Sequence, residues 1–380
     1  MENMESPIVD QEYLEKIGMT GRAYRQVSLA CEICDRRDFE PLLKKGKIGR
    51  AGEYGPINIT QCRHCGHVMM NPRFEKQFYV DYYREHYKDN VAFHSGAAPP
   101  PDQVERQIGR GDKCRLYLAE HGIAGGAMLD LGCGSGATMI PFRKAGWTVQ
   151  GIDPDMEAVE YGTKTLEVPV AYGFAEELPY ADASMDLVIS LGALEHVHDF
   201  GASMAELNRV IKPDGHLFIR MRHNRPWGVM WEYYNRNHYR FFCDETHTLA
   251  VMRWGFDVVE LTDKQVEGRS GDRHLICRRA GEPSAARVEA AITRGVKDSP
   301  ARLKTYLREH HARTVERSKA LLALEERCDG DLDRVAAEIT SGRFPFTLLY
   351  GYSDPSQAVQ RALFEARRYI RESDDDGLCG

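Results

Sequence analysis

The stretch MLDLGCGSG, at positions 128–136, decides the fold of this chain. The apolar residues before Gly132 are typical of a strand buried on both faces, and glycines at alternate positions leave room for a ligand against the backbone. A helix beginning near Ala137 would present its unpaired N–H groups to that ligand. Gly132, Gly134 and Ala137 also fit a loose form of the dinucleotide-binding motif, so these residues alone do not distinguish a nicotinamide cofactor from another ligand.

The next predicted strand ends in the acidic residue that a nucleoside cofactor requires. We predict a helix over residues 137–145, ended by Gly146, and a strand over residues 148–152 with Asp153 at its tip. A carboxylate about 20 residues past a glycine turn can accept hydrogen bonds from ribose hydroxyls. The pattern therefore favours a ligand that contains a ribose.

Four further motifs follow in order: GFAEELPY (173–180), MDLVIS (185–190), LEHV (194–197) and ELNRVIKPDGHLFI (206–219). Together with the glycine turn and Asp153, they resemble the class I S-adenosylmethionine-dependent methyltransferases, and the resemblance covers residues 111–280. The resemblance implies an α/β fold with a Rossmann-like, seven-stranded sheet that is mostly parallel, its last-inserted strand being antiparallel. It also implies S-adenosylmethionine as the cofactor.

The same resemblance places the cofactor along the motifs. It implies that the three glycines flank the methionine part and that Asp153 holds the ribose. The full set of cofactor residues that we predict is Asp130, Gly132, Cys133, Gly134, Gly136, Asp153, Pro154, Phe174, Ala175 and Leu191. Phe174 stands where the family usually has an acidic residue for the adenine amino group, so we expect adenine to stack on Phe174 or to pair with the Ala175 backbone.

Length and composition exclude several classes of protein. The 380 residues are enough for two domains with a sizeable core. The formal net charge of −7 gives no sign, for the chain as a whole, of the basic surface that nucleic-acid binding requires. No apolar run approaches the roughly 20 residues of a membrane span, and residues 1–10 lack a signal-peptide core. We therefore expect a cytoplasmic protein with no membrane partner, in which the ten cysteines stay reduced.

Two Cys-x-x-Cys pairs predict a metal site near the N-terminus. Four thiolates brought together in this way can surround one tetrahedral Zn²⁺, which is expected to be structural because no position stays open. The predicted ligands are Cys31, Cys34, Cys62 and Cys65. A redox-active disulfide is the rival interpretation, and His64 or His67 could replace one cysteine.

The N-terminal unit is completed by MNPR at residues 70–73 and by tyrosines at helical spacing. It resembles the zinc-ribbon lead-in of bacterial methyltransferases from sugar, polysaccharide and natural-product pathways. The domains that we predict are an N-terminal segment with the zinc ribbon (1–70), an aromatic helix and Pro-rich linker (71–110), the methyltransferase core (111–280), and a helical C-terminal region with an acidic tail (281–380). The C-terminal helices are expected to form a homodimer interface or a lid.

An insertion over residues 222–243, after a strand predicted at residues 217–221, is rich in aromatic residues and histidines. Because ligands of open α/β sheets bind beyond the carboxyl ends of strands, we predict that the insertion lines the substrate pocket. A hydroxyl acceptor also needs a base, and histidine suits that role near neutral pH. The candidate catalytic residues are His238, His196 and His223.

Glu195 and His196 also resemble the metal-binding stretch of quinone-pathway O-methyltransferases. Those enzymes carry a further acidic residue where Gly192 stands, so the sequence does not support a catalytic Mg²⁺. The function that we predict is methyl transfer to a small polar acceptor, foremost a sugar or nucleotide-sugar hydroxyl, with C- or N-methylation open. The alternative is a cofactor-binding module, or a methyltransferase for macromolecules, whose ribbon docks protein or nucleic acid through the basic residues at 44–50.

Overall fold

A computed structural model describes most of the chain between residues 21 and 341. The described residues are 14–15, 19, 21–45, 57–85, 99, 101–222, 238–264, 266–267, 272–292, 300–341, 359–360, 362–363 and 366–367. His223, most of the predicted insertion and the acidic tail lie outside the described residues.

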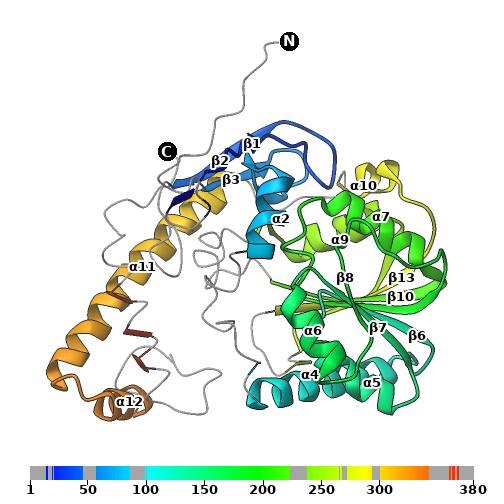
Figure 1. Ribbon diagram of the computed structural model, residues 1–380. Helices are drawn as coiled ribbons and strands as arrows, with labels where there is room; N and C mark the ends of the chain where they lie inside the picture. The colour runs from blue at the N-terminus through cyan, green and yellow to red at the C-terminus, as the bar shows by residue number, and fades with distance from the viewer. Residues whose placement is uncertain are drawn as a thin grey trace.

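A seven-stranded sheet, with helices above and below it, forms the right-hand part of the molecule in Figure 1. Its order is β12-β13-β10-β9-β6-β7-β8; β13 pairs antiparallel with β10 and β12, and the strands from β10 to β8 pair in parallel. This confirms the predicted sheet, although β10 begins six residues before the predicted 217–221 strand, at Ile211. The strands are β6 (Ala127–Leu131), β7 (Thr148–Asp153), β8 (Val170–Tyr172), β9 (Met185–Leu191), β10 (Ile211–Arg222), β12 (Phe256–Thr262) and β13 (Asp272–Arg279).

Helices cover both faces of this sheet. Figure 1 shows α4, α5 and α6 on one face and α7, α9 and α10 on the other. The bounds are α4 (Pro101–Glu120), a 3₁₀ turn (Ala137–Met139) leading into α5 (Ile140–Lys144), α6 (Met156–Lys164), α7 (Phe200–Val210), α9 (Asp244–Arg253) and α10 (Ala285–Ile292). The glycine turn therefore leads from β6 into the helical layer that holds α4 and α5.

A second sheet carries the cysteine pairs. Its order is β11-β4-β3-β2, and its strands are β2 (Phe39–Lys45), β3 (Ile57–Cys62), β4 (Val68–Met70) and β11 (Arg240–Phe241). Strand β11 comes from the residues assigned to the insertion, and its Arg240 pairs with Met69 of β4. The end of the predicted insertion thus completes the N-terminal ribbon.

The chain crosses from the ribbon to the core through a short aromatic unit. Strand β1 (Gln26–Val27) pairs with β5 (Arg73–Phe74), and α2 (Lys76–Glu85) follows. The four cysteines of the ribbon share one apolar cluster with the sheet face under α7 and α9, where Phe200 and Leu249 lie. The ribbon is therefore packed against the core of the seven-stranded sheet.

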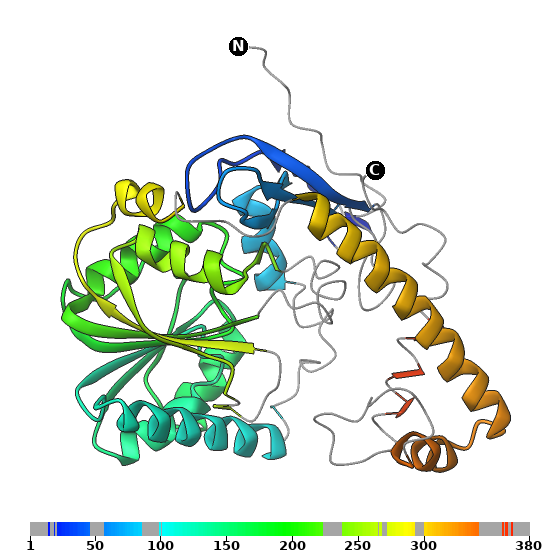
Figure 2. The same cartoon turned by 180° about the vertical axis from the view of Figure 1, so that it is seen from behind.

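The C-terminal helices have an apolar core of their own. Helix α11 (Pro300–Arg327) begins near the ribbon and runs away from the seven-stranded sheet to α12 (Leu332–Thr340) (Figures 1 and 2). Leu321 and Leu324 of α11 pack with Val335 of α12 and with Val359. A role in dimerisation or as a lid stays a prediction. In the part of the chain that the structure describes, no helix is both long and apolar enough for a membrane crossing.

Candidate active site

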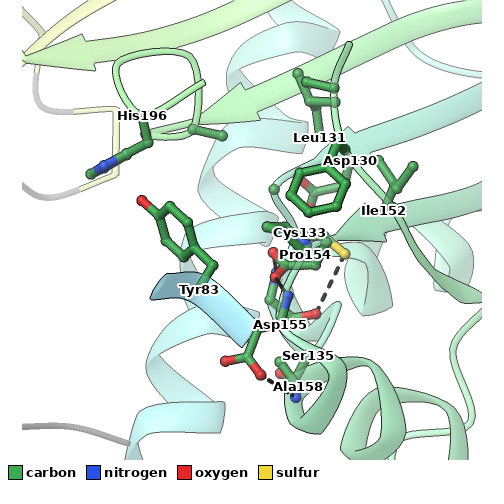
Figure 3. A pocket seen from close by; sticks show the side chains of 18 of the residues that line it. Tyr83, Asp130, Leu131, Cys133, Ser135, Ile152, Pro154, Asp155, Ala158 and His196 are labelled. Carbon is green, nitrogen blue, oxygen red and sulfur yellow. Dashed lines mark hydrogen bonds between the residues drawn. The ribbon is translucent and has the colours of Figure 1, made fainter. Parts of the chain in front are cut away.

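The glycine turn after β6 forms one wall of a cavity at the carboxyl edge of the sheet (Figure 3). The cavity has a volume of about 730 Å³, which is within the range of ligand pockets. Gly134 has a φ of +55°, and a Cβ built there meets no atom within 4 Å, so the backbone is open at this point. Nine of the ten predicted cofactor residues line the cavity; the exception is Gly136, where a Cβ would meet Met139 and Val168.

Two carboxyl groups lie at the ends of the adjacent strands β6 and β7. Asp153 accepts hydrogen bonds from the backbone N–H groups of Gly134, at 2.7 Å, and Asp155, at 2.8 Å, so it fixes the glycine turn. Burial raises the pKa of Asp153 to about 6 in spite of these bonds. Burial also raises the pKa of Asp130 to about 7, with Arg110 opposing the shift. A cationic ligand in this cavity would favour the ionised form of both groups.

A buried ionic cluster behind the cavity was missed by the sequence analysis. Arg110 of α4 and Arg220 of β10 place their Nε atoms 2.6 and 3.2 Å from the Glu267 carboxylate. Burial would raise the pKa of Glu267, but His274, 3.1 Å away, and the two guanidinium groups lower it to about 2. Arg220 also donates to the Leu191 carbonyl at the end of β9. No motif predicts this cluster, because Arg110, Arg220 and the Glu267–His274 pair come from three separate parts of the chain.

A second group of side chains lies at the other side of the cavity. Tyr83 and His196 are found there, apart from the residues of the glycine turn (Figure 3). The His196 ring centroid is 4.5 Å from that of His238, which is only 5% exposed. Glu195 is 3% exposed, and its carboxylate lies within 4.8 Å of both imidazoles. The structure thus brings together two of the three predicted bases, of which His196 lines the cavity while His238 lies behind it. The third, His223, lies outside the described residues.

Two arginines hold the loop that carries His196. Arg240 of β11 donates to the Val197 carbonyl at 2.6 Å, and Arg73 of β5 donates to the His198 carbonyl at 2.5 Å. Burial, helped by the charge of Arg73, lowers the pKa of His198 to about 4, so this imidazole is neutral at physiological pH. The roles of these three residues are not evident in the sequence, because their contacts depend on how the ribbon packs on the core.

The four predicted metal ligands meet inside the ribbon. Their Sγ atoms lie within 4.8 Å of one another, with 3.4 Å between Cys31 and Cys65 and 3.5 Å between Cys34 and Cys62. Tetrahedral zinc with Zn–S bonds of about 2.3 Å sets sulfur separations of about 3.8 Å. A disulfide requires about 2.05 Å, and all four cysteines are free thiols. The arrangement therefore fits Zn²⁺ better than the rival redox pair.

Neither His64 nor His67, the histidines beside the second Cys-x-x-Cys pair, takes the place of a cysteine ligand. His64 Nε2 lies 2.9 Å from a carboxylate oxygen of Glu289, on α10. His67 is fully buried, with its ring centroid 5.0 Å from that of Phe242. Both side chains therefore connect the ribbon to the core.

Comparisons with known proteins match the central part of the chain. Residues 129–219 match a family model described as a methyltransferase domain. The chain is 32% identical over 146 residues to methyltransferase GfsG of Streptomyces halstedii, covering 36% of this chain and 52% of that protein. It is also 32% identical over 158 residues to the ubiquinone biosynthesis O-methyltransferase of Rhodopseudomonas palustris, covering 40% and 57% respectively.

A solved structure similar to this one is the Burkholderia thailandensis 1,6-didemethyltoxoflavin-N1-methyltransferase, with 18% identity, a TM-score of 0.43 and coverage of 57% of this chain and 96% of that one. The chain spans about half the length of the two curated relatives. The family match extends from β6 into β10 and contains the glycine turn, Asp153 and His196. Residues 129–219 are therefore similar to a methyltransferase domain, and they lie within the seven-stranded sheet and its helices.

Proposed function

We propose that this protein is a cytoplasmic enzyme that transfers a methyl group from S-adenosylmethionine to a small polar acceptor, namely a hydroxyl of a sugar or nucleotide sugar. The observation that carries the proposal is one continuous cavity that joins the glycine turn and Asp153 to His196. In-line transfer requires cofactor and acceptor to be held next to each other, and such a cavity can hold both.

The residues at the turn fit this cofactor. The open backbone at Gly134 suits the methionine part, Asp153 suits the ribose, and the ring of Phe174 in the cavity wall suits adenine. When bound, S-adenosylmethionine supplies an electrophilic methyl group on a positively charged sulfur. Asp130 and Asp153 provide the negative charge that balances the cation, and Arg110 is placed to bind a carboxylate at the cavity wall.

A hydroxyl acceptor is favoured over an amine by the side chains at the far side of the cavity. A hydroxyl must lose its proton during transfer, and His196 and His238 lie together where the proton would leave. Tyr83 and the neutral His198 also line this side and provide polar contacts for a sugar.

We further propose that the four ribbon cysteines hold one structural Zn²⁺. The distances between the thiols support this, because they are close to those that a tetrahedral ion imposes. Metal binding would then contribute directly to the folding of the ribbon.

The cofactor assignment is tested by calorimetry with S-adenosylhomocysteine. Asp153→Ala should weaken binding by about 1–3 kcal/mol, as for hydrogen bonds lost to a buried partner. Asp182→Ala is the matched control, since Asp182 is exposed, pairs with Arg209 and does not line the cavity. Unchanged affinity in Asp153→Ala, or tighter binding of a nicotinamide dinucleotide, would contradict the assignment.

The acceptor is tested with a panel of nucleotide sugars and a cofactor labelled in its methyl group. Label should pass to a sugar hydroxyl, and His238→Ala should lower turnover by at least about 10² at unchanged cofactor affinity. Transfer to RNA or protein alone would contradict the small-molecule proposal.

A further inference from the structure

Glu195, His196 and His238 place a carboxylate oxygen and two imidazole nitrogens within 4.8 Å of one another. We infer that these three side chains form a second metal site, separate from the cysteines, which binds a divalent transition-metal ion such as Zn²⁺ or Co²⁺ at the acceptor end of the cavity. The inference deepens the proposed function and rests on it for the role of the ion.

The two chain segments of this site are fixed relative to each other. The Tyr239 backbone N–H donates to the Glu195 carbonyl at 3.0 Å, which brings the residue before it, His238, beside residues 195–196. Arg240 donates to the carbonyls of Leu194, at 3.3 Å, and Val197, at 2.6 Å. The Glu195 and His238 side chains are almost fully buried, whereas His196 is half-buried and lines the cavity. Groups held in this way are preorganised as ligands.

The donor set selects the kind of ion. Two histidines and one glutamate are the protein ligands of several catalytic zinc sites, which keep a further position open for water or substrate. Imidazole nitrogen suits zinc and its neighbours in the first transition row, while Mg²⁺ prefers oxygen ligands. A tetrahedral ion with bonds of about 2.1 Å would need ligand atoms about 3.4 Å apart. Of the three side chains, His196 lines the cavity.

The structure also explains why the ligands differ from an acidic, magnesium-type set. A Cβ at Gly192 would lie 2.1 Å from Nη2 of Arg220, so the guanidinium fills the space that a side chain at position 192 would need. A carboxylate side chain at position 192 would have to displace this guanidinium. The third ligand comes instead from His238, which β11 brings next to the loop.

The ion would act on the acceptor hydroxyl. A hydroxyl bound to the ion would have a lowered pKa, and its proton would pass to solvent near neutral pH. The oxygen lone pair would form the bond to the methyl carbon while the carbon–sulfur bond broke with its electron pair left on sulfur, giving the neutral thioether S-adenosylhomocysteine. In this arrangement the imidazoles bind the metal through the lone pairs that a free base would use.

The test counts metal in protein whose cysteines have first been loaded with Zn²⁺. After dialysis against Co²⁺, atomic emission gives the total of zinc and cobalt per chain, and the wild type should hold one ion more than the cysteine site accounts for. Glu195→Gln and His238→Asn should lose that extra ion. His216→Asn, on β10 and outside the cavity lining, should keep it.

Two further measurements distinguish a wrong metal site from a variant that does not fold and from a wrong proposed function. His196→Asn changes the half-buried ligand, so it tests the site even where a buried substitution prevents folding. Binding of S-adenosylhomocysteine to each variant reports on the fold and on the proposed function independently of the metal count. A wild-type protein that takes up no extra ion at about 1 mM Co²⁺, or His196→Asn and His238→Asn variants that both retain it, overturns the metal site. Absence of S-adenosylhomocysteine binding overturns the proposed function alone.

Discussion

Glu32 Oε1 lies 2.6 Å from Nη2 of Arg240, although 208 positions separate the two residues in the chain. Glu32 is in the loop of the first cysteine pair, and Arg240 is in β11, which holds the loop of His196. Burial alone would raise the pKa of Glu32, but Arg240 and Arg73 keep it well below its usual range. The carboxylate is therefore ionised, and through Arg240 it connects the cysteine loop to the loop of His196.

Glu32→Gln should destabilise the protein by about 3–5 kcal/mol, because it leaves two buried guanidinium groups without their counter-charge. Chemical denaturation followed by fluorescence measures this loss. Asp35→Asn is the control in the same loop: Asp35 pairs with Arg253 but is 62% exposed, so its loss should cost less than about 1 kcal/mol. Similar losses for the two variants would contradict the assigned role of Glu32.

Cys31→Ser should reduce the tightly held zinc from one ion per chain to nearly none, since three thiolates bind the ion far less strongly. Amide hydrogen exchange should show lost protection in β3 and β4, while β6 and β9 keep theirs. Cys114→Ser is the control, because Cys114 is buried in the cluster on the other face of the sheet. A Cys31→Ser protein that retained its zinc would exclude the four-cysteine site.

Gly192→Ala should destabilise the protein by more than about 2 kcal/mol. Its φ of +94° is costly for alanine, and the added Cβ would also displace the buried guanidinium of Arg220. Gly146→Ala isolates the backbone cost, since Gly146 has a φ of +89° and no atom within 4 Å of its Cβ position; about 1 kcal/mol is expected there. Equal shifts of the melting temperature for the two variants would rule out a clash at residue 192.

Binding of S-adenosylmethionine near pH 6.5 should release protons. Because the pKa of Asp130 is raised to about 7, this carboxyl is largely protonated at pH 6.5 before the cation binds and ionised afterwards. Affinity should therefore rise with pH through this window and level off above it. Calorimetry in two buffers with different ionisation enthalpies measures the released protons, and Asp130→Asn should remove most of them. A fall in affinity for S-adenosylmethionine between pH 6 and pH 8 would contradict this prediction.

The cofactor side of the cavity could be predicted because its residues are close together in the sequence. The turn from Gly132 to Gly136 and the carboxylate of Asp153 follow from one strand–helix–strand unit, and the structure places both at the cavity, apart from Gly136. Gly136 faces Val168 and Val170 instead, a packing contact that the alternating glycine pattern does not reveal.

The side of the cavity that holds His196 could be predicted only in part. Glu195 and His196 are neighbours in the sequence, but nothing in the sequence places His238 beside them, because that contact depends on β11 pairing with the ribbon. Arg73 and Arg240 were missed for the same reason. A two-residue strand such as β11 has no periodicity of its own, so its position follows from tertiary contacts.

The ribbon sheet can be completed only late in synthesis, because β11 pairs with β4 but is made long after it. Met69 leaves the ribosome long before Arg240, its partner in the ribbon sheet, so β4 has an open edge while the seven-stranded sheet is still being made. An unpaired strand edge invites association with other chains, and newly made domains are most exposed to it. We expect N-terminal fragments that end before residue 240 to aggregate or to engage chaperones. The ribbon is therefore not a module that can be moved to another protein by itself.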